Sequence, residues 1–267
     1  MTKIITHAGA WHADEISAIS IFSILHNLPL VVKRSIDATT MLPNEKYVQT
    51  FLGEIPIERK FVISTEELAD PSILVLDVGR EYSNTLSNLD HHQNGELYSS
   101  NILMLRWLQG QGHNATTFLK LKDYLFSRIS DIDRGIVVGG GESYEFNSII
   151  RACDSFEQAL ELSIGIISRM LKDIEKELLD VKLFNALPVI GKVALNKDSN
   201  ILLGWKEAAK AKGLWGLVTP NARGGFNLIS RDSEAFCIRA TDNQTFRHES
   251  GFMAVYATQN EAIEAAE

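Results

Sequence analysis

The feature that most constrains the fold is a continuous apolar run, SILVLDVG at 72–79, which ends in an aspartate and a glycine. An uninterrupted run of this length is typical of a strand that is buried on both faces, as in parallel sheets. KIIT at 3–6 predicts another strand, followed by a helical pattern at 15–27, a strand-like segment at 28–35 and a weaker strand candidate at 61–64. Strands that alternate with helices favour an α/β fold, with a parallel sheet that has helices on both faces.

The second half of the chain has a different pattern. Residues 101–130 are mostly helical in pattern with a break near QGQGHN, and 130–146 is rich in loop-forming residues, including GGG at 139–141, which we expect to be a flexible linker. Apolar residues recur on one face over 156–182, which predicts a long amphipathic helix. Short strand candidates follow, separated by turn residues: PVIGKVAL, ILLGW, LWGLVTP, GFNLISR and AFCIRAT.

These patterns predict an N-terminal α/β domain over 1–150, a connector helix over 151–183 and a smaller α+β domain over 184–267. A length of 267 residues fits two modest domains. The formal net charge of −8 gives no overall indication of nucleic-acid binding, although a local basic patch remains open. Two widely separated cysteines argue against a disulfide framework, and the absence of a signal or membrane-spanning run predicts a cytoplasmic protein with no membrane partner.

Polar residues gather where the predicted strands end, which is where open α/β sheets bind their ligands. The set comprises His7, His12, Asp14, Asp77, Asp90, His91, His92, Asp131 and Asp133. Carboxylates and imidazoles together suit manganese, zinc, iron or magnesium. A pair of divalent ions about 3.5–4 Å apart can clamp a phosphoryl group and activate water. Asp77, mounted at the tip of the strongest strand, is the natural bridge between two such ions.

Each of these residues also has an ordinary structural explanation. An aspartate after a strand commonly forms a turn or caps a helix, as Asp14 would do. The clustering favours a metal site, because five of the seven histidines lie in the first 92 residues and four of these flank predicted strand ends. His26 and His113 are isolated in or beside helical segments, and we predict structural roles for both.

The tripeptide Asp90-His91-His92 resembles the motif of the DHH phosphoesterase superfamily. Five segments in order resemble successive motifs of its Myg-type (melanocyte proliferating gene) family: THAGAWHADE at 6–15, LDVGREY at 76–82, LDHHQ at 89–93, DIDRG at 131–135 and FRHESGF at 246–252. That family comprises metal-dependent hydrolases, and its eukaryotic member is described as an RNA exonuclease. The resemblance implies a DHH-like catalytic domain over 1–150 and a substrate-binding domain over 184–267.

The resemblance also implies a ligand set for two divalent cations. The implied ligands are His7 and His12 for one cation, Asp14 and His91 for the other, Asp77 as the bridge, and Asp133 to complete a site. Manganese is the expected metal, with magnesium, zinc and iron as alternatives.

The same resemblance implies roles for residues that hold no metal. His92 would contact or protonate the substrate phosphate, and Asp90 would orient the adjacent histidines from behind. In the second domain, Arg247, His248 and Gly251 would bind substrate by offering positive charge and backbone N–H groups.

The chain departs from the superfamily's motifs at three places. His12 stands where an aspartate is usual, which favours metals that accept imidazole. Ser130 replaces an aspartate of the fourth motif with Asp131 beside it, so that Asp131 and Asp133 both remain ligand candidates. Tyr82-Ser83-Asn84 stands in place of Tyr-Asp-Pro.

The sequence therefore predicts a two-metal phosphoesterase that acts on nucleotides or short single-stranded RNA or DNA, in the manner of a 3′-to-5′ exonuclease. One alternative is hydrolysis of pyrophosphate or another small phosphate compound, and the acidic net charge slightly favours it. Another is a metal-binding scaffold without turnover. Peptide hydrolysis fits the chemistry of a metal centre, but no HExxH motif is present. Assembly into a homo-oligomer is left open.

Overall fold

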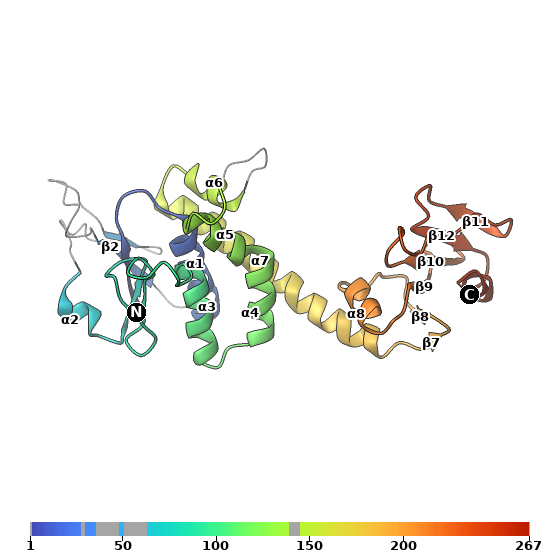
Figure 1. The fold of residues 1–267 in the computed structure, drawn as a ribbon, viewed down its shortest axis with the longest axis horizontal. Coiled ribbons are helices and arrows are strands. Elements are labelled where there is room, and N and C mark those ends of the chain that lie inside the picture. The colour runs from blue at the N-terminus through green and yellow to red at the C-terminus, as the bar shows by residue number, and fades with distance from the viewer. Residues whose placement is uncertain (1, 28–29, 36–47, 51–62, 139–144, 267) are drawn as a thin grey trace. The chain divides into compact units, whose positions relative to one another are not determined.

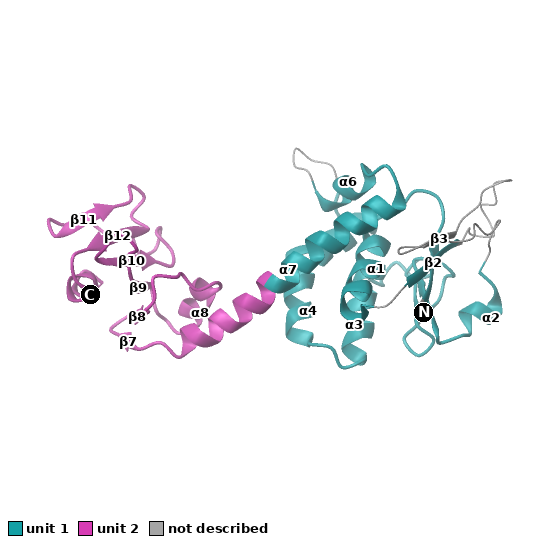
Figure 2. Ribbon diagram, turned by 180° about the vertical axis from the view of Figure 1, so that it is seen from behind, with its two compact units in different colours: residues 1–172 teal, residues 173–267 magenta. Residues whose placement is uncertain are grey.

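The computed structural model describes residues 2–27, 30–35, 48–50, 63–138 and 145–266. The chain divides into two compact units, residues 1–172 and 173–267, and each is described by itself (Figure 2). The division falls inside helix α7 (Phe156–Asn185), in the region where the connector helix is predicted. In the described ranges, no helix has the length and apolar character needed to cross a membrane.

Unit 1 is built on a six-stranded, mostly parallel sheet, which confirms the predicted α/β class (Figure 1). Its strands are β1 (Thr2–His7), β2 (Leu30–Ser35), β3 (Val48–Thr50), β4 (Ile73–Leu76), β5 (Tyr82–Ser83) and β6 (Asn88–Leu89), in the order β3-β2-β1-β4-β6-β5. Strands β2, β1, β4 and β6 run parallel, and β3 and β5 pair antiparallel at the edges. Every residue of β4 is buried, as its continuous apolar run predicts.

Successive side chains of a strand point to opposite faces of the sheet. Ile5 of β1 and Val75 of β4 are paired in register and pack with apolar residues around helix α2 (Thr65–Leu68) on one face. The third strand predicted at 61–64 is not formed where the structure describes it, because Ser64 instead caps α2 with its hydroxyl. Positions 61–62 lie outside the described residues.

The remaining helices of unit 1 are α1 (Ala13–His26), α3 (Ser100–Gly110), α4 (Ala115–Leu121), the π-helical turn η1 (Lys122–Phe126), α5 (Ser127–Asp133) and α6 (Phe146–Arg151). The first ten residues of α1 are all buried, so this helix packs on several sides. The break predicted near QGQGHN is confirmed. Gly112 adopts a positive φ of 91°, and the side chain of Asn114 caps α4.

The loop-rich joint predicted over 130–146 is wrong at its start. Helix α5 continues to Asp133, because Phe126 and Ile129 are buried at helical spacing and hold the polar SDID segment in the helix. The linker predicted at 139–141 lies outside the described residues.

Unit 2 contains a second six-stranded sheet. Its elements after α7 are β7 (Val189–Ile190), β8 (Val193–Leu195), α8 (Trp205–Ala211), β9 (Gly216–Pro220), β10 (Phe226–Ser230), β11 (Gln244–Arg247), β12 (Met253–Tyr256) and α9 (Gln259–Glu264), with strand order β11-β12-β10-β9-β8-β7. Two strand predictions are wrong. ILLGW leads into α8, which begins at Trp205 after a left-handed Gly204. AFCIRAT forms no strand, because Ile238 is its one buried residue where a strand would bury alternate side chains.

Candidate metal centre

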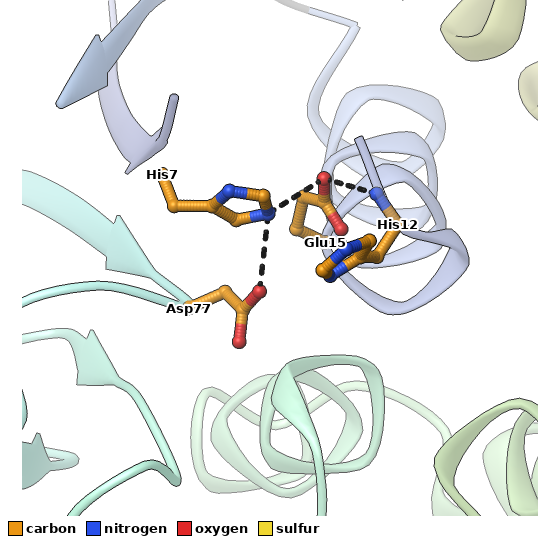
Figure 3. Close-up of side chains that lie close together, drawn as sticks. All are labelled: His7, His12, Glu15 and Asp77. Carbon is orange, nitrogen blue, oxygen red and sulfur yellow. Dashed lines mark hydrogen bonds and ion pairs between the residues drawn. The ribbon is translucent and has the colours of Figure 1, made fainter. Parts of the chain in front are cut away.

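The site begins at the carboxyl ends of two neighbouring parallel strands. Thr6 of β1 pairs with Leu76 of β4, so the next residues, His7 and Asp77, come side by side. His7 Nε2 lies 3.4 Å from Asp77 Oδ2 (Figure 3). The backbone of Asp77 is left-handed, with φ of 56°, an uncommon conformation that aspartate tolerates better than most residues. The strand therefore ends at Leu76, and the residue that follows, Asp77, is buried, with a side chain that is 1% exposed.

The first turn of α1 adds a second group of side chains. His12 is the residue that precedes the helix, and its N–H donates to Glu15 Oε1 at 2.6 Å. Glu15 is fully buried, and the same oxygen lies 3.1 Å from His7 Nε2 (Figure 3). Asp14 is also buried and accepts a hydrogen bond from the N–H of Ser100, at the start of α3, at 3.3 Å.

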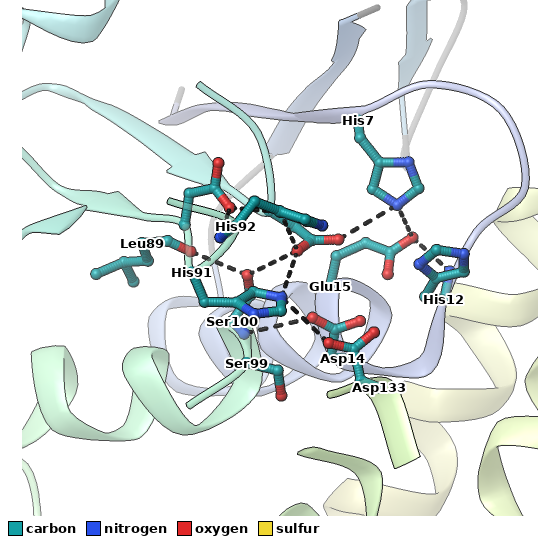
Figure 4. Close-up of polar contacts among 12 residues, drawn as sticks. His7, His12, Asp14, Glu15, Leu89, His91, His92, Ser99, Ser100 and Asp133 are labelled. Atoms are coloured by element: carbon teal, nitrogen blue, oxygen red, sulfur yellow. Dashed lines mark hydrogen bonds and ion pairs between the residues drawn. The ribbon is translucent and has the colours of Figure 1, made fainter. Parts of the chain in front are cut away.

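The two adjacent histidines follow β6 and differ in their surroundings. His91 is buried, and its Nε2 lies 3.2 Å from Asp77 Oδ1 and 3.1 Å from Asp133 Oδ2 (Figure 4). The side chain of His92 is 52% exposed, and its Nδ1 bonds to Asp90 Oδ1 at 2.7 Å. The second oxygen of Asp90 accepts the N–H of Arg80 at 2.6 Å. Asp90 thus fixes the His92 ring from behind and lies outside the groups of candidate metal ligands.

Ligand atoms from these segments form three overlapping groups, each within 4.8 Å. The groups are His7, His12, Glu15 and Asp77; Asp77, His91 and His92; and His12, Asp14 and Asp133. The structure therefore brings together the six predicted metal ligands. Of the two candidate aspartates, Asp133 belongs to one of these groups and Asp131 belongs to none of them. The main-chain carbonyl of Asp131 accepts the N–H groups of Ile136 and Val137 at 2.8 and 3.1 Å.

Glu15 is the residue that sequence analysis missed. It lies three residues after His12 at the start of a helix, where glutamate commonly serves as a helix cap, and its hydrogen bond to His12 N–H serves that purpose. Its second role, as a candidate metal ligand, is indicated by its complete burial beside His7, and the capping pattern in the sequence does not reveal that burial. Its position within HADE, directly after Asp14, was the available signal.

Buried polar atoms in the site fit a bound cation. Five of them have no hydrogen-bond partner: His7 Nε2, Asp14 Oδ1, Glu15 Oε2, His91 Nε2 and Asp133 Oδ2. The nitrogen–oxygen separations of 3.1–3.4 Å are close but not aligned as hydrogen bonds. Two ligands at about 2.1 Å from one ion are themselves about 3.0–3.4 Å apart in octahedral or tetrahedral geometry. The donor set and its spacing therefore suit divalent cations.

The carboxylates perturb one another strongly. Burial raises the pKa of Asp14 well above its ordinary value, and the charges of Asp77, Asp133 and Glu15 raise it further. Burial acts in the same direction on Asp77, but contacts with His91, His7 and His92 outweigh it and hold the pKa of Asp77 below its ordinary value. Four carboxylates in the three groups carry a formal charge of −4, which two divalent cations would neutralise.

The histidines respond in the opposite direction. Burial alone would lower the pKa of His7, but the nearby charges of Glu15 and Asp77 raise it to about 9. Burial likewise opposes protonation of His91, whose pKa rises to about 10 beside Asp133 and Asp77. The hydrogen bond to Asp90 raises the pKa of His92. Without a bound cation, protons on these rings balance the carboxylates.

The predicted substrate-binding residues lie in unit 2, where Arg247 ends β11 and His248 and Gly251 lie in the turn that follows it. Arg247 Nε donates to the carbonyl of Ile238 at 2.7 Å, and Gly251 N–H donates to the carbonyl of His248 at 2.9 Å. Gly251 has φ of 69°, and a Cβ there would lie 2.4 Å from Cys237 Sγ. Arg247 and Gly251 thus stabilise the turn, and their role in substrate binding stays a prediction.

Comparison of the chain with protein-family models gives no match, and comparison with curated proteins gives none.

Proposed function

We propose that the chain is a metal-dependent phosphoesterase that uses two divalent cations, with manganese expected, to hydrolyse phosphodiester bonds of nucleotides or short oligonucleotides. The observation that carries the proposal is the placement of Asp77. One carboxylate oxygen lies near His7 and the other near His91, so a single buried side chain faces both ligand groups. A carboxylate shared in this way is what a two-ion site requires, because it sets the spacing between the ions.

The remaining ligand candidates overlap around Asp77. His7, His12 and Glu15 form one group with it, His91 lies within 3.2 Å of both Asp77 and Asp133, and His12 also groups with Asp14 and Asp133. When bound, the cations supply an activated water near neutral pH and neutralise the charge of the phosphate. The order of the five motif-like segments along the sequence supports the resemblance to the Myg-type branch of the DHH superfamily. We propose membership of that branch together with the activity.

His92 is suited to proton transfer to the leaving oxygen. It is the half-exposed member of the pair, so a substrate can reach it, whereas His91 is buried. The hydrogen bond from Nδ1 to Asp90 fixes the ring and raises its pKa, which favours the protonated form that a general acid needs. Asp90 is a positioning residue that acts through His92.

The test measures turnover of three substrates in parallel: a 5′-labelled single-stranded RNA, bis-p-nitrophenyl phosphate and pyrophosphate. Each is incubated with Mn²⁺, Mg²⁺, Zn²⁺ or EDTA, using the wild type and Asp77→Asn. Asp131→Asn is the matched control, because it removes a carboxylate from the same helix as Asp133 without touching a ligand group.

Metal-dependent release of mononucleotides that is lost in Asp77→Asn and kept in Asp131→Asn supports the proposal. Turnover of pyrophosphate alone replaces it with hydrolysis of small phosphate compounds. Retention of metal with no turnover of any substrate leaves a metal-binding scaffold instead.

A further inference from the structure

One tyrosine of unit 1, Tyr98, has three positively charged side chains around its ring. The guanidinium carbons of Arg106 and Arg134 lie 4.6 and 5.2 Å from the centre of the Tyr98 ring, and Lys122 Nζ lies 5.8 Å from it. We call these four residues the Tyr98 cluster. Significant cation–π contacts occur about once per 70–80 residues, so three on one ring concentrate positive charge at one place.

Among the described residues, no carboxylate balances the charge of the Tyr98 cluster. Within the ranges that the structure describes, no carboxylate forms a salt bridge with Arg106, Lys122 or Arg134. Nε of Arg134 is buried and has no hydrogen-bond partner there. Three unneutralised like charges repel one another, and they stand out in a chain whose formal net charge is −8. An anion with several charged oxygens would relieve this repulsion.

Two residues of the Tyr98 cluster, Tyr98 and Arg134, adjoin segments that build the metal centre. Arg134 directly follows Asp133, and its Nη2 donates to the carbonyl of Gly95, in the turn after the paired histidines, at 3.1 Å. Tyr98 stands two residues before Ser100, whose N–H binds Asp14. With about 3.8 Å between successive Cα atoms, the Cα atoms of Arg134 and Tyr98 lie within about 8 Å of those of Asp133 and Ser100, respectively.

Two further features suit a nucleic-acid strand. Tyrosine and arginine planes stack with bases irrespective of sequence, and nearby cations contact the phosphates, which is the usual combination in single-strand binding sites. Lys122 begins the π-helical turn η1, and such wide turns inside α-helices are frequently found at functional sites.

We propose that the Tyr98 cluster binds the sugar–phosphate backbone of a single-stranded nucleic acid and thereby selects an oligonucleotide over pyrophosphate. The inference rests on the proposed function, because it names the substrate class of the same metal centre. The test measures binding of nucleic acid under conditions without turnover, so that this inference and the proposed hydrolytic function can fail separately.

The experiment measures fluorescence anisotropy of a labelled 12-nucleotide RNA, and of the DNA of the same sequence, with the full chain in EDTA over a series of salt concentrations. The test variant is Arg106→Gln/Lys122→Gln, which leaves Arg134 beside Asp133 intact. Each lost phosphate contact should weaken binding about 5-fold near 0.1 M salt, hence about 25-fold for two, and the salt slope should fall by about 1.4. The charge-conserving Arg106→Lys/Lys122→Arg variant should keep the wild-type slope.

Lys120→Gln is the matched control. Lys120 lies two residues before Lys122, and its Nζ lies 5.4 Å from the centre of the Tyr124 ring, outside the Tyr98 cluster, so removing this one charge should leave affinity unaltered. The proposal is supported if Arg106→Gln/Lys122→Gln binds the RNA or the DNA more weakly than the wild type does, while Lys120→Gln binds as the wild type does. Wild-type affinity and slope in the double variant, or no binding by the wild type, overturns it. Turnover of bis-p-nitrophenyl phosphate reports separately on the proposed function.

Discussion

Metal binding should release protons from two histidines, and their number can be worked out from the site. His7 and His91 have pKa values raised to about 9 and about 10, so without a cation both rings are protonated at pH 7.5. A metal ligand must give up the proton on its coordinating nitrogen. Filling the site at pH 7.5 should therefore release about 2 protons from these rings, falling to about 1.4 at pH 9. Metal affinity should accordingly rise about 100-fold from pH 6.5 to 7.5.

The assay is calorimetric titration with Zn²⁺ or Mn²⁺ in buffers of different ionisation enthalpy, which counts the protons transferred. His91→Asn should remove about one proton from the count. His113→Gln is the control, since His113 lies outside the ligand groups and should leave the count unchanged. Release of fewer than about one proton at pH 7.5 would refute the reasoning, because the rings would then be neutral beside buried carboxylates.

Three further predictions concern stability and catalysis. His92→Gln should lower kcat by about 10²–10⁴ with no change in metal content, measured by steady-state kinetics and elemental analysis. Gly251→Ala should destabilise unit 2 by about 1–3 kcal/mol more than Gly213→Ala, because both have a positive φ near 70° but only at Gly251 would a Cβ clash; thermal unfolding would show equal losses if the clash were unimportant. In EDTA, the raised pKa values of His7 and His91 stabilise the folded chain fully below about pH 6.5, and this contribution should be lost as pH rises through 9 to 10. A melting temperature that increases over that range would contradict this.

The fold of unit 1 was predictable where burial alone determines structure. Residues 73–76 of the apolar run form a strand because all four are buried, and the parallel pairing of β1 with β4 then places His7 beside Asp77. Two strand predictions in unit 2 failed because single apolar anchors such as Ile238 resemble strand patterns locally. Short apolar segments carry too little periodicity to separate these cases.

The candidate ligands were predictable from sequence where a residue type and its position have no simpler structural explanation. Glu15 was missed because one side chain serves as both helix cap and buried charge. The choice between Asp131 and Asp133 needed the helix. Side chains that are two residues apart on a helix point about 200° away from each other, so only one of Asp131 and Asp133 can face the ligands. A loop at this position would have left both free to do so.

The left-handed backbone at Asp77 limits which side chains the position accepts. Most residues lose about 1–2 kcal/mol in this conformation, whereas aspartate, asparagine and glycine adopt it more readily. Of these three, only aspartate offers two charged oxygens. Glutamate would keep the charge but strain the turn, and asparagine would keep the turn but lose the charge. Backbone geometry and electrostatics thus independently specify the same residue, and substitution by asparagine or by glutamate would measure the two requirements one at a time.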